Sequence, residues 1–108
     1  MNAFKLALTQ LTPILMAEGS QGRCVVNLQK VLRLTGAYTG FVDGIFGAQT
    51  RAAIEALQYY FGLSVTGIFD SNLWYALSVE CTEADLASAE LKAIALDYAE
   101  GALCSIAA

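Results

Sequence analysis

The side chains best suited to acid–base chemistry are few in this chain, and their predicted places do not suit catalysis. Of its 108 residues none is a histidine, and 10 are Asp or Glu. Glycoside hydrolysis needs two carboxyl groups about 5–9.5 Å apart across a cleft. The acidic residues here fall instead at predicted caps, turns and helix surfaces: Asp70, Glu83, Asp85, Glu90 and Asp97. Because the commonest general base and zinc ligand is also absent, the sequence predicts a protein without catalytic activity.

Three cysteines, Cys24, Cys81 and Cys104, are the remaining reactive groups. They form no Cys-x-x-Cys pair, and no histidine is present to activate a cysteine nucleophile. An odd number argues against a complete disulfide framework, and cysteines without a disulfide are often buried. Buried thiols are therefore favoured, no metal or cofactor is expected, and a disulfide between any two of the three stays open.

Two copies of a glycine turn dominate the middle of the sequence. Residues 42–50 read VDGIFGAQT, residues 65–72 read VTGIFDSN, and a helical Leu-Gln pair precedes each run. Asp43-Gly44 is a strong turn signal, because aspartate accepts hydrogen bonds from nearby backbone N–H groups and glycine adopts positive φ. Ile45 and Phe46 are then expected to enter the core. The chain therefore reads as helix, turn, helix, turn, helix.

Hydrophobic periodicity and capping signals give the expected helices. A short amphipathic helix is predicted in an arm over residues 1–11, and Leu15 lies on the same helical face as its apolar residues. Core helices are predicted over 23–34, with Ser20 as N-cap, and over 48–61. The expected inward face of the arm is Phe4, Leu8 and Leu11. That of helix 23–34 is Val25, Leu28, Val31 and Leu32, with Gly36 after its C-terminus. That of helix 48–61 is Ala53, Ile54, Leu57 and Phe61, with Gly62 after its C-terminus.

Two further helices are expected after the second turn. Asp70 is placed to cap a short helix whose Leu73, Trp74 and Leu77 face inward. Thr82 is expected to begin a last helix that reaches about Glu100. That helix has apolar residues on two sides, which is typical of a helix covered on both sides.

Composition limits the classes of partner. The formal net charge is −4 with only 6 Lys and Arg, too few scattered cations to neutralise nucleic-acid phosphates. Hydrophobic residues make up 56% of the chain and charged ones 15%. One small core cannot hold this surplus, so part of it is expected to face a partner, a second copy or a membrane surface. No apolar run is long enough to span a bilayer, and residues 3–17 lack the cleavage site of a signal peptide.

These patterns resemble the peptidoglycan-binding-domain-like family over about residues 13–77. The resemblance rests on many spacings that agree in order, and it departs at Asp70-Ser71, where the family usually has Gly-Pro. The matching pieces are Pro13-Ile14-Leu15, Gly19–Gly22, Val25, Leu28-Gln29, Gly36–Gly40, Val42–Gly47, Thr50, Ala53, Leu57-Gln58, Gly62-Leu63, Val65–Ile68, Trp74 and Leu77. The resemblance implies a mainly α fold, a three-helix bundle with two short β-like glycine turns, and a shallow groove for cell-wall glycopeptide.

Two sets of candidate contact residues follow. Tyr38, Phe41, Asp43 and Tyr59 are predicted to line the groove, although for Asp43 a structural role in its turn is favoured over contact with a ligand. Gln29 and Gln58 are expected to bind neighbouring turn backbone rather than ligand. The candidate partner-binding residues lie near the C-terminus: Leu86, Leu91, Ile94, Leu96 and Tyr98.

The sequence thus predicts an amphipathic arm (1–12), a peptidoglycan-binding-like domain (13–80) and an apolar helical extension (81–108). The leading interpretation is a non-catalytic peptidoglycan-binding module of the cell envelope, located there by the family resemblance alone. The alternative is a docking subunit that uses the same fold within a multiprotein assembly, or self-associates, through its apolar N- and C-terminal segments. Neither interpretation involves nucleic acid or a transmembrane span.

Overall fold

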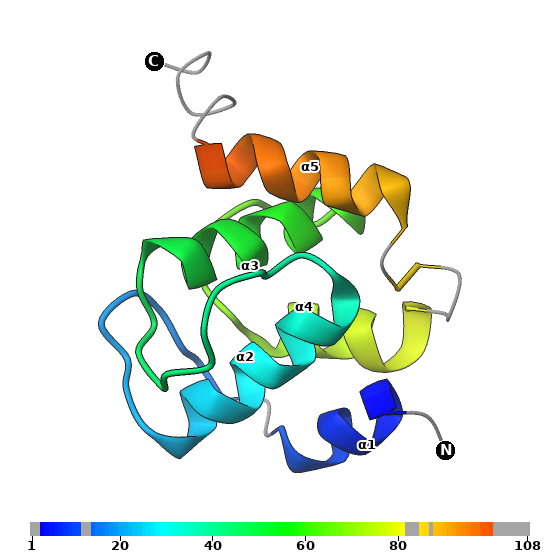
Figure 1. The fold of residues 1–108 in the computed structure, drawn as a ribbon. Coiled ribbons are helices and arrows are strands. Elements are labelled where there is room, and N and C mark those ends of the chain that lie inside the picture. Colours follow the sequence, from blue (N-terminus) through cyan, green and yellow to red (C-terminus); the bar gives the residue numbers. More distant parts are fainter. Residues whose placement is uncertain (1–2, 12–13, 82–84, 87, 101–108) are drawn as a thin grey trace.

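Helices α2 and α3 form the centre of the molecule, with α1 on one side and α5 on the other (Figure 1). The computed structural model describes residues 3–11, 14–81, 85–86 and 88–100. Their helices are α1 (Ala3–Gln10), α2 (Arg23–Thr35), α3 (Ala48–Tyr60), α4 (Ser71–Tyr75), the π-helical turn η1 (Ala76–Glu80) and α5 (Ala89–Glu100). Within these described ranges there are isolated β-bridges but no strands. The predicted mainly α bundle with two short turns is confirmed.

The ends of the two central helices follow the glycine signals, with one exception. Gly36 closes α2 in the left-handed conformation, and its N–H donates to Arg33 O at 3.1 Å. The N–H of Gly62 likewise donates to Tyr59 O after α3. The expected cap at Ser20 is wrong, because Gly22 is the N-cap of α2. Ser20 Oγ instead accepts from the N–H of Ala17 at 3.1 Å and shapes the preceding loop.

The last helix begins later than predicted. It starts at Ala89, and Ser88 caps it by accepting the N–H of Leu91 on its Oγ at 3.1 Å. The predicted start at Thr82 and Glu83 lies outside the described residues, but Asp85 and Leu86 are in a turn. A side chain at residue 86 therefore does not share a helical face with residues 93 and 96.

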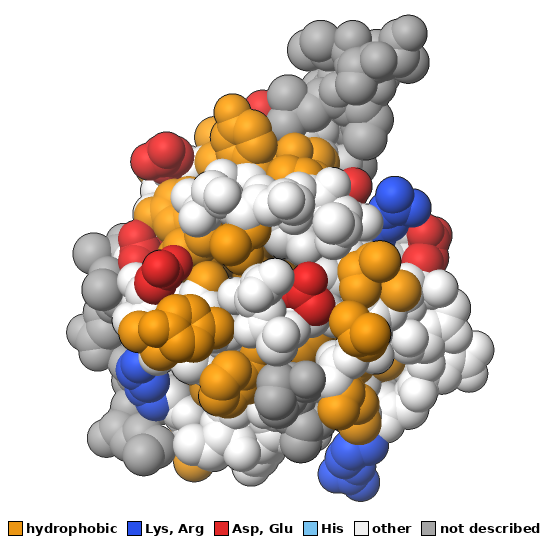
Figure 2. All heavy atoms as spheres, turned by 180° about the vertical axis from the view of Figure 1, so that it is seen from behind, with side chains coloured by type: hydrophobic (Ala, Val, Ile, Leu, Met, Phe, Trp, Pro, Cys, Tyr) orange, Lys and Arg blue, Asp and Glu red, His pale blue; other side chains and the backbone are white. Residues whose placement is uncertain are grey.

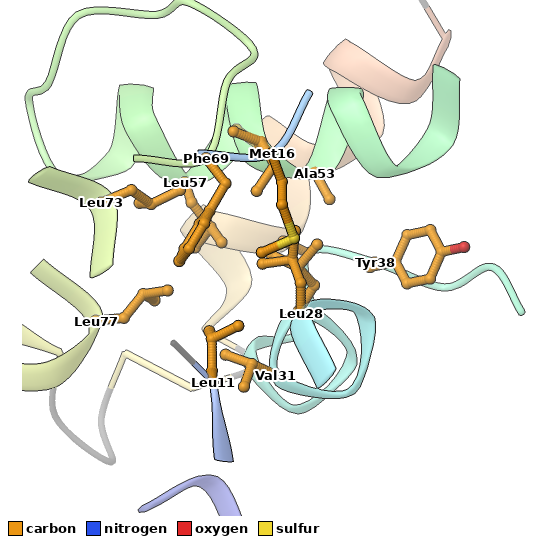
Figure 3. Close-up of a cluster of buried hydrophobic side chains, with 14 of the residues drawn as sticks. Leu11, Met16, Leu28, Val31, Tyr38, Ala53, Leu57, Phe69, Leu73 and Leu77 are labelled. Carbon is orange, nitrogen blue, oxygen red and sulfur yellow. The ribbon is translucent and has the colours of Figure 1, made fainter. Parts of the chain in front are cut away.

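A single hydrophobic cluster joins all the described helices. Figure 3 shows its centre, where side chains from α2, α3, α4 and η1 meet those of residues 11, 16 and 69. Phe46 and Phe69 are buried as equivalent residues of the two turns, whereas Ile45, which was expected inside, is exposed. The arm belongs to the same cluster through buried residues Phe4, Leu8 and Leu11.

Residues 16–22, here called the lead-in segment, run between the two glycine turns. Met16 exchanges two backbone hydrogen bonds with Phe69, at 3.0 and 2.8 Å. Farther along, the N–H of Phe46 donates to Ser20 O at 2.9 Å. Because the segment is extended at Met16, Met16 faces the core and its neighbour Leu15 is 75% exposed. The predicted burial of Leu15 on a helical face is therefore wrong.

The two described cysteines are thiols with different environments. Cys24 is partly buried in α2, and Cys81 is buried directly after η1. Burial, assisted by the negative charge of Asp85, raises the pKa of Cys81 to about 11. Such a thiol is poorly nucleophilic at neutral pH. Cys104 lies outside the described residues.

Candidate ligand-binding groove at the first glycine turn

A buried glutamine from α2 holds the first turn in place. Gln29 Oε1 accepts the N–H of Gly44 at 2.9 Å, and Nε2 donates to Ile45 O at 3.0 Å. The same Nε2 lies 3.1 Å from Asp43 Oδ1 and from Thr50 Oγ1. Buried backbone groups must be paired, so this side chain replaces the partners that a sheet would supply.

The second turn repeats this arrangement with α3. Gln58 Oε1 accepts the N–H groups of Thr66 and Gly67, both at 3.0 Å. Its Nε2 donates to Ile68 O and to Thr66 Oγ1, again at 3.0 Å. Thr66 therefore takes the place of Asp43, and the expectation that both glutamines bind turn backbone is confirmed.

Asp43 is occupied by its own turn. Its Oδ1 accepts the N–H of Ile45 at 3.0 Å, which together with the Gln29 amide lowers the pKa of the exposed carboxyl group. The carboxylate therefore stays ionised at neutral pH and stabilises the turn. This geometry matches the structural role that the sequence favours for Asp43.

The turn glycines test this description. Gly67 has φ of +75°, and a Cβ there would lie 2.8 Å from Arg51 Nε. We expect Gly67→Ser to lower the free energy of unfolding by about 1–3 kcal/mol, because left-handed backbone disfavours a side chain. The matched control is Gly47→Ser, since Gly47 has φ of −107° and open space around it. Equal unfolding midpoints in urea for both variants would contradict the assigned conformation.

A groove borders the first turn along residues 36–40. Its larger hollow, about 380 Å³, lies between this segment and α5, and its smaller hollow, about 80 Å³, lies toward α3. Ala37 and Thr39 line both. We call the two hollows together the first-turn groove, which is lined by Gly36, Ala37, Tyr38, Thr39, Gly40, Gln49, Ala52, Ala53, Lys92, Ala95 and Leu96. The last helix therefore forms one wall of the groove, and among the described residues no segment closes it.

Tyr38 is the one predicted groove residue that lines these hollows, but it is not an exposed contact. It is 6% exposed, and its hydroxyl donates to Phe41 O at 2.6 Å. Figure 3 shows its ring at the margin of the core with the hydroxyl directed away from the cluster. The assumption that its flat ring stands free is wrong, because the ring fills the space beneath the segment.

The other three predicted groove residues lie apart from the hollows. Phe41 is 84% exposed but lines neither hollow. Tyr59 lies in the last turn of α3, where its ring centroid is 6.4 Å from that of Tyr98. The structure thus joins Tyr38, Phe41 and Asp43 around one turn and places Tyr59 against α5.

The predicted partner-binding residues divide into two groups. Leu91 is 1% exposed, and Ile94, Tyr98 and Leu86 pack partly buried against the core. Because Leu91 is buried, it is not available to a partner of the folded chain. The side of α5 that carries Leu91 therefore packs against the chain's own core. Of the five residues, Leu96 is the exposed one, at 57%.

Sequence reasoning missed the groove residues Thr39, Gln49 and Lys92. A run of small residues, Gly36-Ala37 and Gly40 around Tyr38, was the available signal for a surface hollow. No sequence pattern indicated that α5 would form a wall of the groove. That helix follows the repeated unit, and tertiary structure decides what it packs against.

Away from the groove, the described residues offer little cationic or metal-binding chemistry. On the face opposite to the view of Figure 1, hydrophobic side chains lie among uncharged and acidic ones, and the drawn Lys and Arg side chains lie at the margins (Figure 2). No group of three or more acidic or cysteine side chains in the described residues is placed to hold a metal ion. Among the helices described, none is both long and apolar enough to cross a membrane.

Comparison with known proteins identifies the family of the central part of the chain. Residues 21–77 match the family described as "Putative peptidoglycan binding domain". The chain is 39% identical over 71 residues to the spore cortex-lytic enzyme of Bacillus cereus. The aligned region covers 66% of this chain but 27% of that enzyme. The chain is 32% identical over 95 residues to the zinc D-Ala-D-Ala carboxypeptidase of Streptomyces albus G, which covers 80% of the chain and 36% of that protein.

A solved structure agrees with these sequence matches. The crystal structure of the SleB N-terminal domain superimposes with a TM-score of 0.59 at 36% identity, covering 62% of this chain and 92% of that one. The chain spans about a quarter or less of the length of the spore cortex-lytic enzymes that it matches. Since the family match covers more than half of the residues, this chain belongs to the peptidoglycan-binding domain family.

Proposed function

We propose that this chain is a non-catalytic module that binds peptidoglycan through the first-turn groove. The observation that carries the proposal is the groove itself, which is lined by residues of the family-matched part and by α5. Ligand sites are concave and mostly apolar with a few polar groups that fix orientation. The first-turn groove has that composition.

The chemistry of the groove suits a glycopeptide. Gly36 and Ala37 allow a ligand to approach the backbone closely, because they carry little or no side chain. Thr39 and Gln49 offer hydroxyl and amide groups that match the amides of a stem peptide. Lys92 adds one cation at the α5 wall, where a ligand carboxylate can pair with it.

The proposal includes the absence of catalysis and a place in the cell envelope. No described carboxyl pair faces across the groove, and the chain contains no histidine. The matched relatives include a spore cortex-lytic enzyme and a zinc D-Ala-D-Ala carboxypeptidase, and this chain corresponds to a minor part of each. Within the proposal, residues 13–80 bind the wall, while the arm (1–12) and the extension (81–108) are accessory parts.

Cosedimentation with purified cell-wall sacculi tests the function. The intact chain is expected to pellet with sacculi at low salt and to remain soluble without them. Thr39 is exposed and lines both hollows, so Thr39→Arg should reduce the pelleted fraction at least fivefold by filling the groove.

Ser64→Arg is the matched control, because it adds the same charge at an exposed position that lines neither hollow. It should pellet as the unmodified chain does. If the unmodified chain stays in the supernatant, the proposed function is wrong. If Thr39→Arg pellets fully, the chain binds the wall elsewhere than in the first-turn groove.

A further inference from the structure

We propose that a second hollow, between α1 and the α4–η1 segment, binds a pyranose sugar unit of a glycan. This inference rests on the proposed function and adds a separate contact to it. The hollow measures about 260 Å³ and is lined by Lys5, Leu8, Thr9, Trp74 and Ser78. We call it the Trp74 pocket. Its size is below the range of about 300–1,000 Å³ typical of drug-sized ligands, which suits one small unit.

Trp74 provides an apolar wall in a fixed orientation. Its indole N–H donates to Leu11 O at 3.1 Å. Since this N–H is the only polar group of the side chain, the part of the ring that lines the pocket is apolar. Leu8 extends the same wall from α1. A pyranose ring presents a face of C–H groups, which packs against an aromatic surface of this kind.

Polar groups stand beside that apolar wall. Thr9 Oγ1 donates its proton to Leu6 O at 2.6 Å, so its lone pairs remain available to a ligand hydroxyl. Lys5 Nζ lies 3.4 Å from Ser78 O at the edge of the pocket. A sugar with an apolar face and a rim of hydroxyl groups meets an apolar wall and an acceptor here.

Ser78 gives a second, independent observation. Its Oγ is buried and has no hydrogen-bond partner among the described residues. Such groups are rare because each lost hydrogen bond is costly. Ser78 also lies in η1, and π-helical turns occur frequently at functional sites. Because this oxygen is buried, a ligand hydroxyl would reach it only after the side chain turned toward the pocket, and it would then recover part of the missing bonding.

The Trp74 pocket is separate from the first-turn groove. One of its walls is α1, which precedes the family-matched residues 21–77. Figure 1 places α1 and α5 on opposite sides of the central helices, so the two sites open on different parts of the surface. Two sites on one molecule raise its avidity for a polymeric ligand without any stronger single contact.

Tryptophan fluorescence of the full chain tests the inference, because Trp74 is its only tryptophan. Soluble oligomers of N-acetylglucosamine should produce a saturable change in emission, whereas a stem peptide without sugar should produce none. Thr9→Met should weaken the apparent affinity at least tenfold by filling the pocket. Gln10→Met, at the adjacent exposed residue that does not line it, should respond as the unmodified chain does.

The Thr39→Arg variant separates the two sites. It should lose sedimentation with sacculi and keep the Trp74 response to the sugar oligomers. No saturable response of the unmodified chain, an equal response to the peptide alone, or unchanged affinity of Thr9→Met overturns the inference. Sedimentation of the unmodified chain without a Trp74 response would reject the Trp74 pocket and leave the proposed function standing.

Discussion

Replacing Gln58 with methionine should lower the free energy of unfolding by about 2–4 kcal/mol. Methionine keeps the length of the side chain but removes both of its hydrogen-bonding ends. The N–H groups of Thr66 and Gly67 would then lose their common acceptor, and Ile68 O would lose its donor. A buried backbone group left without a partner costs about 1–3 kcal/mol. Urea denaturation followed by circular dichroism measures this loss.

Gln49→Met is the control for that experiment. Gln49 lies on the same helix but is exposed, and substitutions at such positions usually change stability by less than about 0.5 kcal/mol. The slope of the free energy against urea should be the same for both variants, because neither changes the extent of the fold. If Gln58→Met unfolds at the urea concentration of the control, the side chain does not hold the second turn.

Leu91 and Leu96 provide the second large contrast, on one helix and with one residue type. Leu91→Ala should cost about 2–5 kcal/mol, because truncation of a buried leucine removes apolar contacts and leaves a cavity. Leu96→Ala should stay within about 0.5 kcal/mol, since Leu96 is largely exposed. Thermal unfolding of the two variants under the same conditions compares them directly. Similar losses at both positions would show that α5 packs in another rotation on α3.

Leu96 also tests the alternative of a docking subunit. Leu96→Asp should leave the fold intact because the side chain faces solvent. Light scattering coupled to size exclusion then reports the assembly state of the folded variant. A monodisperse monomer for both the unmodified chain and Leu96→Asp would remove self-association through α5 as an explanation of the apolar surplus.

The repeated turns explain why so much of the central fold was predictable. Each turn needs a glycine in the left-handed conformation and a side chain from a neighbouring helix that both donates and accepts hydrogen bonds. These requirements can be recognised in the sequence as Gly44 with Gln29 and Gly67 with Gln58. The helix ends at Gly36 and Gly62 follow the same rule of backbone conformation. Local chemistry therefore determined these elements, and local chemistry can be read from sequence.

The predictions that failed depend on packing over longer distances. Leu15 and Met16 are both apolar, and the pairing of Met16 with Phe69 decides which one turns inward. Tyr38 has a ring that suits either a surface or an interior, and its bond to Phe41 O fixes it inside. The groove wall at Lys92 and the pocket beside Trp74 arise from helices at the two ends of the chain, whose positions no local pattern specifies.

The lead-in segment has a consequence for where this module starts as a folding unit. The match to the family model begins at residue 21, but the backbone of Met16 is hydrogen-bonded to Phe69 in the second turn. Residues before the matched range thus close the far end of the fold. A fragment trimmed to the region of similarity would lose the buried Met16 side chain and leave two backbone groups of Phe69 unpaired. The physical edge of the domain lies upstream of the range matched by the family model, and expression boundaries drawn from that range alone would remove part of the closure.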